Sequence, residues 1–148
     1  MAEGAIAPDF ELPDQDGKPV SLSALLLDGP VVLFFYPAAM TAGCTKEACH
    51  FRDLAAEFAA VGTRRVGIST DTVDRQKKFV GANGLDFTLL SDADGAVATA
   101  YGVRRRLLTP VKRATFVIDA DRTLLAVITS ELNMEVHADR ALEALNSR

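Results

Sequence analysis

The sequence predicts an α/β fold with a central mixed β-sheet flanked by helices. Residues 31–36 form an unbroken apolar and aromatic run, which is typical of a central parallel strand buried on both faces. From this run to about residue 90, strand and helix patterns alternate as in a βαβαβ unit. A β-hairpin pattern and a last helix pattern follow, so we expect a mixed sheet with helices on both faces.

A further β-hairpin is predicted at the N-terminus. Residues 7–12 and 19–22 have the pattern of two short strands, joined by a turn rich in Asp and Gly. Ser21 or Ser23 is expected to cap a short helix that ends at Leu27. The Asp-Gly-Pro sequence that follows breaks this helix before the buried strand begins.

The remaining elements are predicted from local patterns. Past Gly43, apolar residues recur in steps of three and four, which predicts one amphipathic helix that reaches about Val61. Asp71 is expected to be the N-cap of a following helix, which Gly81 and Gly84 close. The other predicted elements are strands at 65–70, 87–90, 115–119 and 124–129, and helices at 97–101 and in a C-terminal segment that includes Met134 and Val136.

The chain of 148 residues, 49% of them apolar, has the size of a single domain spanning residues 1–148. Its net charge of −4 gives no general attraction to nucleic acid or to an anionic membrane. The N-terminus has no basic lead and no apolar signal core, and no stretch approaches the roughly 20 apolar residues of a membrane span. We therefore expect a cytoplasmic protein without nucleic-acid or membrane partners.

Both cysteines follow the buried strand. Cys44 falls in the first turn of the predicted helix, on its inward face, where unpaired backbone N–H groups and the helix dipole favour a thiolate. This position makes Cys44 a candidate nucleophile, although isolated cysteines are usually small buried hydrophobes. Cys49 lies about 140° around the helix and roughly 7.5 Å along it. An intact helix would keep this pair beyond disulfide reach, so we expect a redox cycle coupled to unwinding of the first turn.

No metal site is expected from the sequence. A closely spaced cysteine pair in a reducing compartment is usually catalytic or metal-binding. The chain lacks the Cys-x-x-Cys and His-x-x-x-His spacings of zinc sites. Its only histidines are His50 and His137, and a site of two cysteines and two histidines would have to recruit both.

The segment Pro37-x-x-x-Thr41-x-x-Cys44 resembles the active-site signature of the peroxiredoxin family. Cys49 matches the resolving cysteine of the peroxiredoxin Q class, also called bacterioferritin comigratory protein. A lone Cys-x-x-x-x-Cys would be a weak signal, but the resemblance extends over most of the chain. Its five segments are residues 7–12, 34–37, 43–53, 66–69 and 113–119.

This resemblance implies a thioredoxin-like fold that carries the N-terminal β-hairpin. It also implies thiol peroxidase activity, in which a hydroperoxide and a reduced dithiol give an alcohol or water and a disulfide. The usual reductant in this class is thioredoxin, and sometimes glutaredoxin. Neither a metal nor an organic cofactor is implied, and relatives of this class are often monomers.

The family's roles carry over to five positions of this chain. Cys44 corresponds to the peroxidatic thiolate and Cys49 to the resolving thiol, which captures the sulfenic acid before it is overoxidised. Arg113 corresponds to the guanidinium that polarises the peroxide, because a fixed cation stabilises the charge that develops on the leaving oxygen. Thr41 supplies a hydroxyl that can both donate and accept, and Pro37 shields the sulfur from water.

Two nearby positions have supporting roles in this comparison, and a third departs from the usual pattern of the family. The backbone amide of Gly43 is expected to donate to the developing charge, together with that of Cys44. Glu47, placed in the first turn of the helix, either positions Arg113 by a charge-assisted hydrogen bond or only complements the helix dipole. Ala42 stands where most relatives have proline, which removes a backbone restraint and is expected to ease unwinding.

Two other functions stay open from the sequence alone. A thiol–disulfide exchange protein would act on protein disulfides, although the absent Cys-x-x-Cys disfavours it. A peroxide-sensing or chaperone-like binding protein would keep the fold and use its thiols only as a sensor. We assign no function to the basic run formed by Arg104, Arg105 and Arg106, because such runs are usually solvated loops.

Overall fold

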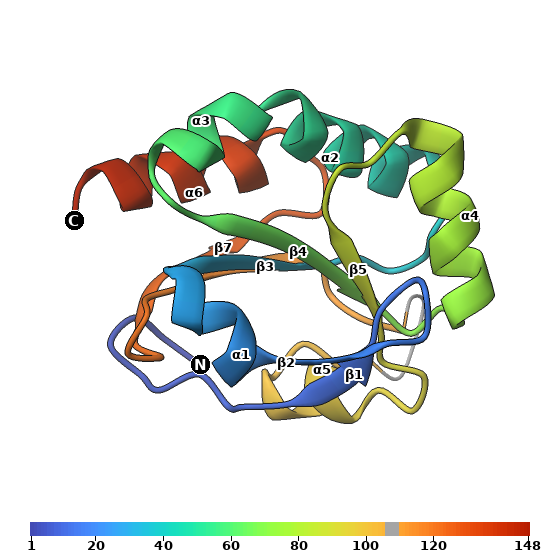
Figure 1. The fold of residues 1–148 in the computed structure, drawn as a ribbon, viewed down its shortest axis with the longest axis horizontal. Helices are drawn as coiled ribbons and strands as arrows, with labels where there is room; N and C mark the ends of the chain where they lie inside the picture. Colours follow the sequence, from blue (N-terminus) through green and yellow to red (C-terminus); the bar gives the residue numbers. More distant parts are fainter. Residues whose placement is uncertain (106–109) are drawn as a thin grey trace.

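The computed structural model describes residues 1–105 and 110–148. Its centre is a five-stranded sheet in the order β5-β4-β3-β6-β7 (Figure 1). The strands are β3 (Val31–Phe35), β4 (Arg64–Ser69), β5 (Thr88–Ser91), β6 (Ala114–Ile118) and β7 (Leu124–Thr129). The central strand β3 pairs parallel with β4 and antiparallel with β6. The prediction of a mixed sheet is confirmed, although only one neighbour of the predicted parallel strand runs parallel to it.

Helices cover both faces of this sheet, as the sequence predicts (Figure 1). One face carries α2 (Ala42–Asp53), α3 (Ala55–Ala60), α4 (Val73–Asn83) and α6 (Val136–Asn146). The other face carries α1 (Leu22–Leu25), the 3-10 helix η1 (Leu26–Asp28) and α5 (Ala96–Ala100). The predicted N-terminal hairpin is formed by β1 (Glu11–Pro13) and β2 (Pro19–Ser21), which pair antiparallel. In the described parts of the chain, no helix combines the length and apolarity needed to cross a bilayer.

The side chains of β3 divide between two apolar cores because successive residues point to opposite faces. Leu33 and Phe35 belong to the core under α1 and α5, whereas Phe34 belongs to the core under α2 and α6. All five residues of β3 are fully buried. The Phe34 ring stacks on Phe51 of α2 with 4.3 Å between centroids, and this contact fixes α2 against the sheet.

A glycine in β4 makes room for this aromatic layer. A Cβ atom at Gly67 would lie 2.7 Å from Cδ2 of Leu89 and 2.8 Å from Cζ of Phe34. Both distances are below contact distance, and both neighbours are fully buried. Gly67 is therefore required for the close packing of β4 between β3 and β5.

Several predicted helix boundaries are wrong. The predicted C-terminal helix includes Met134, but α6 begins at Val136. The helix expected to reach Val61 is divided at Leu54, which separates α2 from α3. The N-cap of α4 is Thr72 and not the predicted Asp71. The Thr72 hydroxyl accepts from the Arg75 amide at 3.3 Å. Gly81 lies inside α4, which ends where Gly84 adopts a left-handed conformation with φ of 58°.

Candidate active site

Cys44 is the third residue of α2 and is 1% exposed. It lies close to the carboxyl end of β3, because only the six residues 36–41 separate β3 from α2. Thr41 occupies the N-cap position of α2 with extended backbone angles. Its hydroxyl donates to the carbonyl of Ala38 at 2.8 Å and makes no capping bond to α2. The two oxygen lone pairs of Thr41 remain available as acceptors.

The loop before α2 is held by residues that follow β4. The amide of Ala39 donates to Oδ2 of Asp71 at 2.7 Å, and the guanidinium of Arg75 donates to the Ala39 carbonyl at 3.2 Å. The hydroxyl of Ser69 donates to the same oxygen of Asp71 at 2.7 Å. Asp71 therefore anchors the active-site loop, which explains why the neighbouring Thr72 and not Asp71 caps α4.

Arg113 lies directly above the sulfur of Cys44. It immediately precedes β6, whose first residue Ala114 pairs with Phe35 at the end of β3. The Nη2 atom of Arg113 is 3.3 Å from Sγ of Cys44, and its Nη1 atom donates to Oε1 of Glu47 at 2.7 Å. The structure thus brings Cys44, Glu47 and Arg113 together, although Arg113 is 69 positions from Cys44 in the sequence.

Glu47 positions Arg113 in this structure. It lies in the second turn of α2 and not in the first, so the sequence-based placement was wrong and the helix dipole does not explain it. Its side chain is fully buried, and burial raises the pKa of Glu47 to about 8 although the Arg113 guanidinium acts to lower it. Burial of the guanidinium opposes its charge, but Glu47 and Cys44 outweigh this effect and raise the pKa of Arg113.

Gly43 allows the guanidinium to approach α2 closely. A Cβ atom at this position would lie 3.3 Å from Nη2 of Arg113 and 3.6 Å from Sδ of Met134. Any side chain would therefore press on the group that contacts Cys44. This steric requirement was not expected from the sequence, which predicted a role only for the Gly43 amide.

Cys49 faces a different neighbour from Cys44. Its side chain is half-buried, and its Sγ atom lies 3.8 Å from Oδ1 of Asn83 at the end of α4. Both thiols are free, and α2 is continuous between them. Ideal helix geometry separates the Cα atoms of Cys44 and Cys49 by about 8.7 Å, which exceeds the reach of a disulfide.

Other residues of this region pack or hold the loop. Tyr36 is fully buried, and its hydroxyl donates to Oε1 of Gln76 in α4. Pro37 is half-buried at the turn that leads to α2. Met40 is 49% exposed and has a φ of 68°, which belongs to the sparsely populated left-handed region.

A histidine near the site was not predicted from the sequence. His137 in α6 is fully buried, with Nδ1 2.8 Å from the Thr115 hydroxyl and Nε2 2.8 Å from the Ser130 carbonyl. Its Nδ1 atom lies 3.7 Å from Oε2 of Glu47. The one feature of the sequence that could have revealed it is weak: His137 is the only polar residue on the buried face of α6, which is otherwise apolar.

Two arginines of the basic run have structural partners. Nη1 of Arg104 donates to the carbonyl of Asp94 at 2.9 Å. Arg105 pairs with Glu131 at 2.8 Å, and the same carboxylate oxygen accepts from the backbone amide of Arg113 at 3.1 Å. Arg106 lies outside the described residues.

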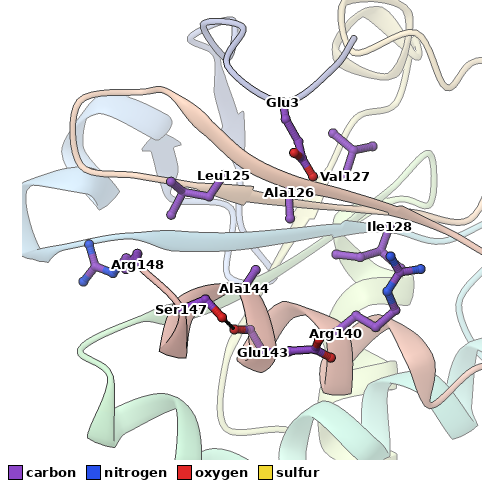
Figure 2. A pocket seen from close by; sticks show the side chains of 10 residues that line it. All are labelled: Glu3, Leu125, Ala126, Val127, Ile128, Arg140, Glu143, Ala144, Ser147 and Arg148. Atoms are coloured by element: carbon purple, nitrogen blue, oxygen red, sulfur yellow. Dashed lines mark hydrogen bonds between the residues drawn. The ribbon is translucent and has the colours of Figure 1, made fainter.

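No metal-binding cluster is present within residues 1–105 and 110–148, where no three His, Cys, Asp or Glu side chains gather around one point. A surface cavity of about 400 Å³ lies between β7 and α6 (Figure 2). Charges of both signs line it, from Glu3, Glu143, Arg140 and Arg148. Its lining contains neither cysteine, so this cavity is separate from the site around Cys44.

A buried thiol at the start of a helix, covered by a guanidinium on a thioredoxin-like sheet, defines a thiol-based oxidoreductase. A sequence model of the AhpC/TSA family matches residues 4–127. The crystal structure of peroxidoxin BcpB from Mycobacterium tuberculosis is 63% identical and has a TM-score of 0.96, covering 99% of this chain and 97% of that one. The chain therefore belongs to the AhpC/TSA family of peroxiredoxins, which are thiol-dependent peroxidases.

Two further comparisons point to the peroxiredoxin Q class. Chloroplastic peroxiredoxin Q from Sedum lineare is 41% identical over 148 residues, which cover 99% of this chain and 79% of that protein. A structure of peroxiredoxin Q from Xanthomonas campestris is 28% identical with a TM-score of 0.87, covering 94% of this chain and 90% of that one. The resemblance noted in the sequence is thus confirmed at the level of family and fold.

Proposed function

We propose that the protein reduces hydroperoxides through Cys44, with Cys49 as the resolving thiol and a thioredoxin-type dithiol as the reductant. The observation that carries this proposal is the 3.3 Å contact between Nη2 of Arg113 and Sγ of Cys44. Both side chains are buried, so the guanidinium acts on the sulfur in a medium of low dielectric constant. A cation at this distance stabilises a thiolate and the negative charge that forms during peroxide cleavage.

In the first step, the Cys44 thiolate attacks one oxygen of the peroxide. A sulfur–oxygen bond forms while the oxygen–oxygen bond breaks, so the sulfur is oxidised by two electrons and the peroxide is reduced. The leaving oxygen departs as an anion, takes up a proton and becomes water or an alcohol. Arg113 stabilises this anion, and the amides of Gly43 and Cys44 at the start of α2 are suitably placed to assist.

Thr41 and Pro37 lie in the segment between β3 and α2 that leads to Cys44. We propose that Thr41 binds the protonated oxygen of the peroxide. Its hydroxyl donates to the Ala38 carbonyl, so its oxygen lone pairs can accept a hydrogen bond from the peroxide O–H group. We assign to Pro37 the exclusion of water from the sulfur, since it is half-buried at the turn before α2.

In the second step, the Cys49 thiol attacks the sulfenic acid of Cys44. A disulfide forms and water leaves, which protects Cys44 from further oxidation. Because the helix holds the two Cα atoms too far apart, this step requires the first turns of α2 to unwind. A dithiol of the thioredoxin or glutaredoxin type then reduces the disulfide by exchange, and α2 can form again.

Relatives suggest the substrate class. Alkyl peroxide reduction activity is described for the bacterioferritin comigratory protein of Xanthomonas campestris, which is 28% identical to this chain. We propose that this chain likewise accepts organic hydroperoxides as well as hydrogen peroxide. We further propose that the protein is a monomer and is located in the cytoplasm. Sedimentation of the reduced and the oxidised protein would test the oligomeric state.

Single turnovers with hydrogen peroxide and with cumene hydroperoxide test this function. Cys44→Ser should abolish peroxide consumption. Cys49→Ser should consume one equivalent to form sulfenic acid at Cys44, and a second equivalent of peroxide should oxidise this to sulfinic acid, both visible in mass spectra. Arg113→Met should slow the first step by about 100-fold to 1,000-fold, the usual loss for one charge-stabilising donor. Arg64→Met is the matched control, because Arg64 forms an exposed ion pair with Asp28.

The same assays separate the two alternatives. Turnover with thioredoxin, its reductase and peroxide supports the peroxidase. Reduction of insulin without peroxide consumption would instead identify a thiol–disulfide exchange protein. Oxidation of Cys44 without turnover by thioredoxin or glutaredoxin would identify a sensor.

A further inference from the structure

Glu47 has one carboxylate oxygen without a hydrogen-bond partner. Its Oε1 atom accepts from Arg113, but its Oε2 atom is buried and has no partner among the described residues. Burying an ionised carboxylate with one oxygen unpaired raises the free energy of the folded state, and a proton on or beside that oxygen would remove this penalty. Nδ1 of His137 lies 3.7 Å from this oxygen.

The two hydrogen bonds of His137 suit both of its protonation states. The Ser130 carbonyl at 2.8 Å can only accept, so Nε2 carries a hydrogen in the neutral ring and in the imidazolium. The Thr115 hydroxyl at 2.8 Å from Nδ1 can donate to the neutral ring or accept from the charged one. His137 can therefore gain or lose a proton at Nδ1 without losing either partner.

We propose that Glu47 and His137 share a single proton and form a buried pair without net charge, which leaves the charge of Arg113 to be balanced by Cys44. His137 is thus a positioning residue of the peroxidase site, acting through Glu47 and Arg113. The inference rests on the proposed role of Cys44 as the nucleophile. It assigns a function to a histidine that does not contact the sulfur.

The charges around the sulfur explain the effect. If Glu47 were an unprotonated anion, it would neutralise Arg113, and a Cys44 thiolate would add an uncompensated buried negative charge. With one proton on the pair, Arg113 and the thiolate compensate each other. Burial raises the pKa of Glu47 to about 8 and lowers the pKa of His137 from its ordinary value of 6.5, so burial favours the neutral form of each group and a single proton on the pair resides mainly on Glu47.

The remaining charged groups around this pair come from three segments. Cys44 approaches from α2, and Arg113 from the residue before β6. Glu131 follows β7, accepts from the Arg113 amide and pairs with Arg105. His50 and Asp139 join α2 and α6 in a partly exposed pair at 2.8 Å, which provides a control on the same two helices.

The test is the pH dependence of the reaction between Cys44 and hydrogen peroxide. The chain has no tryptophan to report the reaction by fluorescence, so competition with a haem peroxidase measures the rate constant. The wild-type rate should fall at least threefold above about pH 8, where Glu47 loses its proton. His137→Asn should move the falling limb to lower pH and reduce the rate at pH 7 about tenfold, whereas His50→Asn should keep the wild-type profile.

A double variant separates this role from simple packing. In the His137→Asn background, Glu47→Gln should restore at least half of the lost rate at pH 7, since glutamine cannot become a competing anion. A packing defect at His137 would not be relieved in this way. A wild-type profile in His137→Asn, or a double variant as slow as His137→Asn alone, would overturn the inference and leave the peroxidase function intact.

A second measurement needs neither activity nor the His137 variant. The chain has only two histidines, so ¹³C-labelled His137 can be followed by NMR in His50→Asn protein. Its ring signals should shift with the same midpoint as the falling limb of the rate, and this transition should move in Glu47→Gln. A ring that shows no transition between pH 5 and 10 would exclude a shared proton.

Discussion

Sγ of Cys49 lies 3.8 Å from Oδ1 of Asn83, so the second thiol rests against the end of α4 while Cys44 rests under Arg113. Asn83 is itself fixed, because its Nδ2 atom donates to the Phe79 carbonyl at 3.1 Å and its own carbonyl accepts from Arg52 at 2.5 Å. The two thiols therefore contact separate parts of the structure until α2 unwinds.

Asn83→Asp should slow formation of the disulfide. A carboxylate in place of the amide would disfavour negative charge on Cys49, and this repulsion should weaken as salt is added. We expect a threefold to tenfold lower rate of the second step at low salt, with the first step unchanged, in quenched-flow mass spectrometry. Asn83→Leu is the matched uncharged control, and an equal loss in that variant would show that packing and not charge is responsible.

Ala42→Pro should separate helix unwinding from peroxide chemistry. Ala42 is the first residue of α2, where proline is well tolerated because the amide has no partner within the helix. Proline there should raise the free energy of unfolding by about 0.4–1 kcal/mol. We expect slower disulfide formation and an unchanged first step, and equal rates of disulfide formation in both proteins would contradict the need to unwind this turn.

Gly67→Ala should destabilise the fold by about 1–3 kcal/mol, the usual cost of overpacking a well-filled core. The added methyl group would meet Leu89 and Phe34 at 2.7–2.8 Å. Gly81→Ala is the matched control, since the same methyl group meets no atom within 4 Å inside α4 and should stabilise by about 0.5–1 kcal/mol. Urea unfolding measures both, and equal effects would show that the space around Gly67 does not matter.

The stability of the protein should fall between about pH 6.5 and pH 8. Glu47 has a pKa raised from 4.5 to about 8, so its stabilising contribution is complete below pH 4.5 and is lost as pH rises. The pKa of His137 is lowered from 6.5, so its contribution is present above pH 6.5 and is lost on acidification. Just below pH 6.5 the trend from His137 opposes the loss from Glu47, and above pH 6.5 only the loss from Glu47 remains.

Urea unfolding in the Cys44→Ser background measures this trend without a contribution from the thiolate. Glu47→Gln should remove the decline above pH 6.5 and leave stability that rises with pH up to about 6.5, because only His137 still titrates. Parallel curves for the two proteins would mean that Glu47 does not hold a proton in the folded state.

Local patterns were enough to predict most elements of the fold. The unbroken apolar run of β3 indicates a strand that is buried on both faces. The apolar residues of α2 recur every three or four positions, which indicates a helix that is buried on one face. The division at Leu54 was missed because the apolar steps of three and four continue across it, and the alanines that follow it also favour helix. Asp71 was misplaced because its carboxylate binds Ala39, a contact that spans 32 positions.

In the active site too, local patterns predicted the position of a residue in its own element but not its contacts with distant residues. The position of Cys44 in the first turn followed from the pattern of the helix alone. Its contact with Arg113 spans 69 positions, so it came from the family resemblance and not from any local pattern. His137 was considered only as a metal ligand, since nothing in its own segment reveals that Glu47 lies beside it.

The stack of Phe51 on Phe34 limits how far α2 can unwind from its N-terminus. Phe51 is fully buried and also contacts Phe58 of α3, with 5.8 Å between ring centroids. Melting that starts at Ala42 would have to break this aromatic anchor before it could pass into the last turn of α2. If the proposed cycle unwinds α2 as far as Cys49, the released segment contains both thiols and ends before Phe51, so we expect each cycle to leave this aromatic contact shielded from solvent.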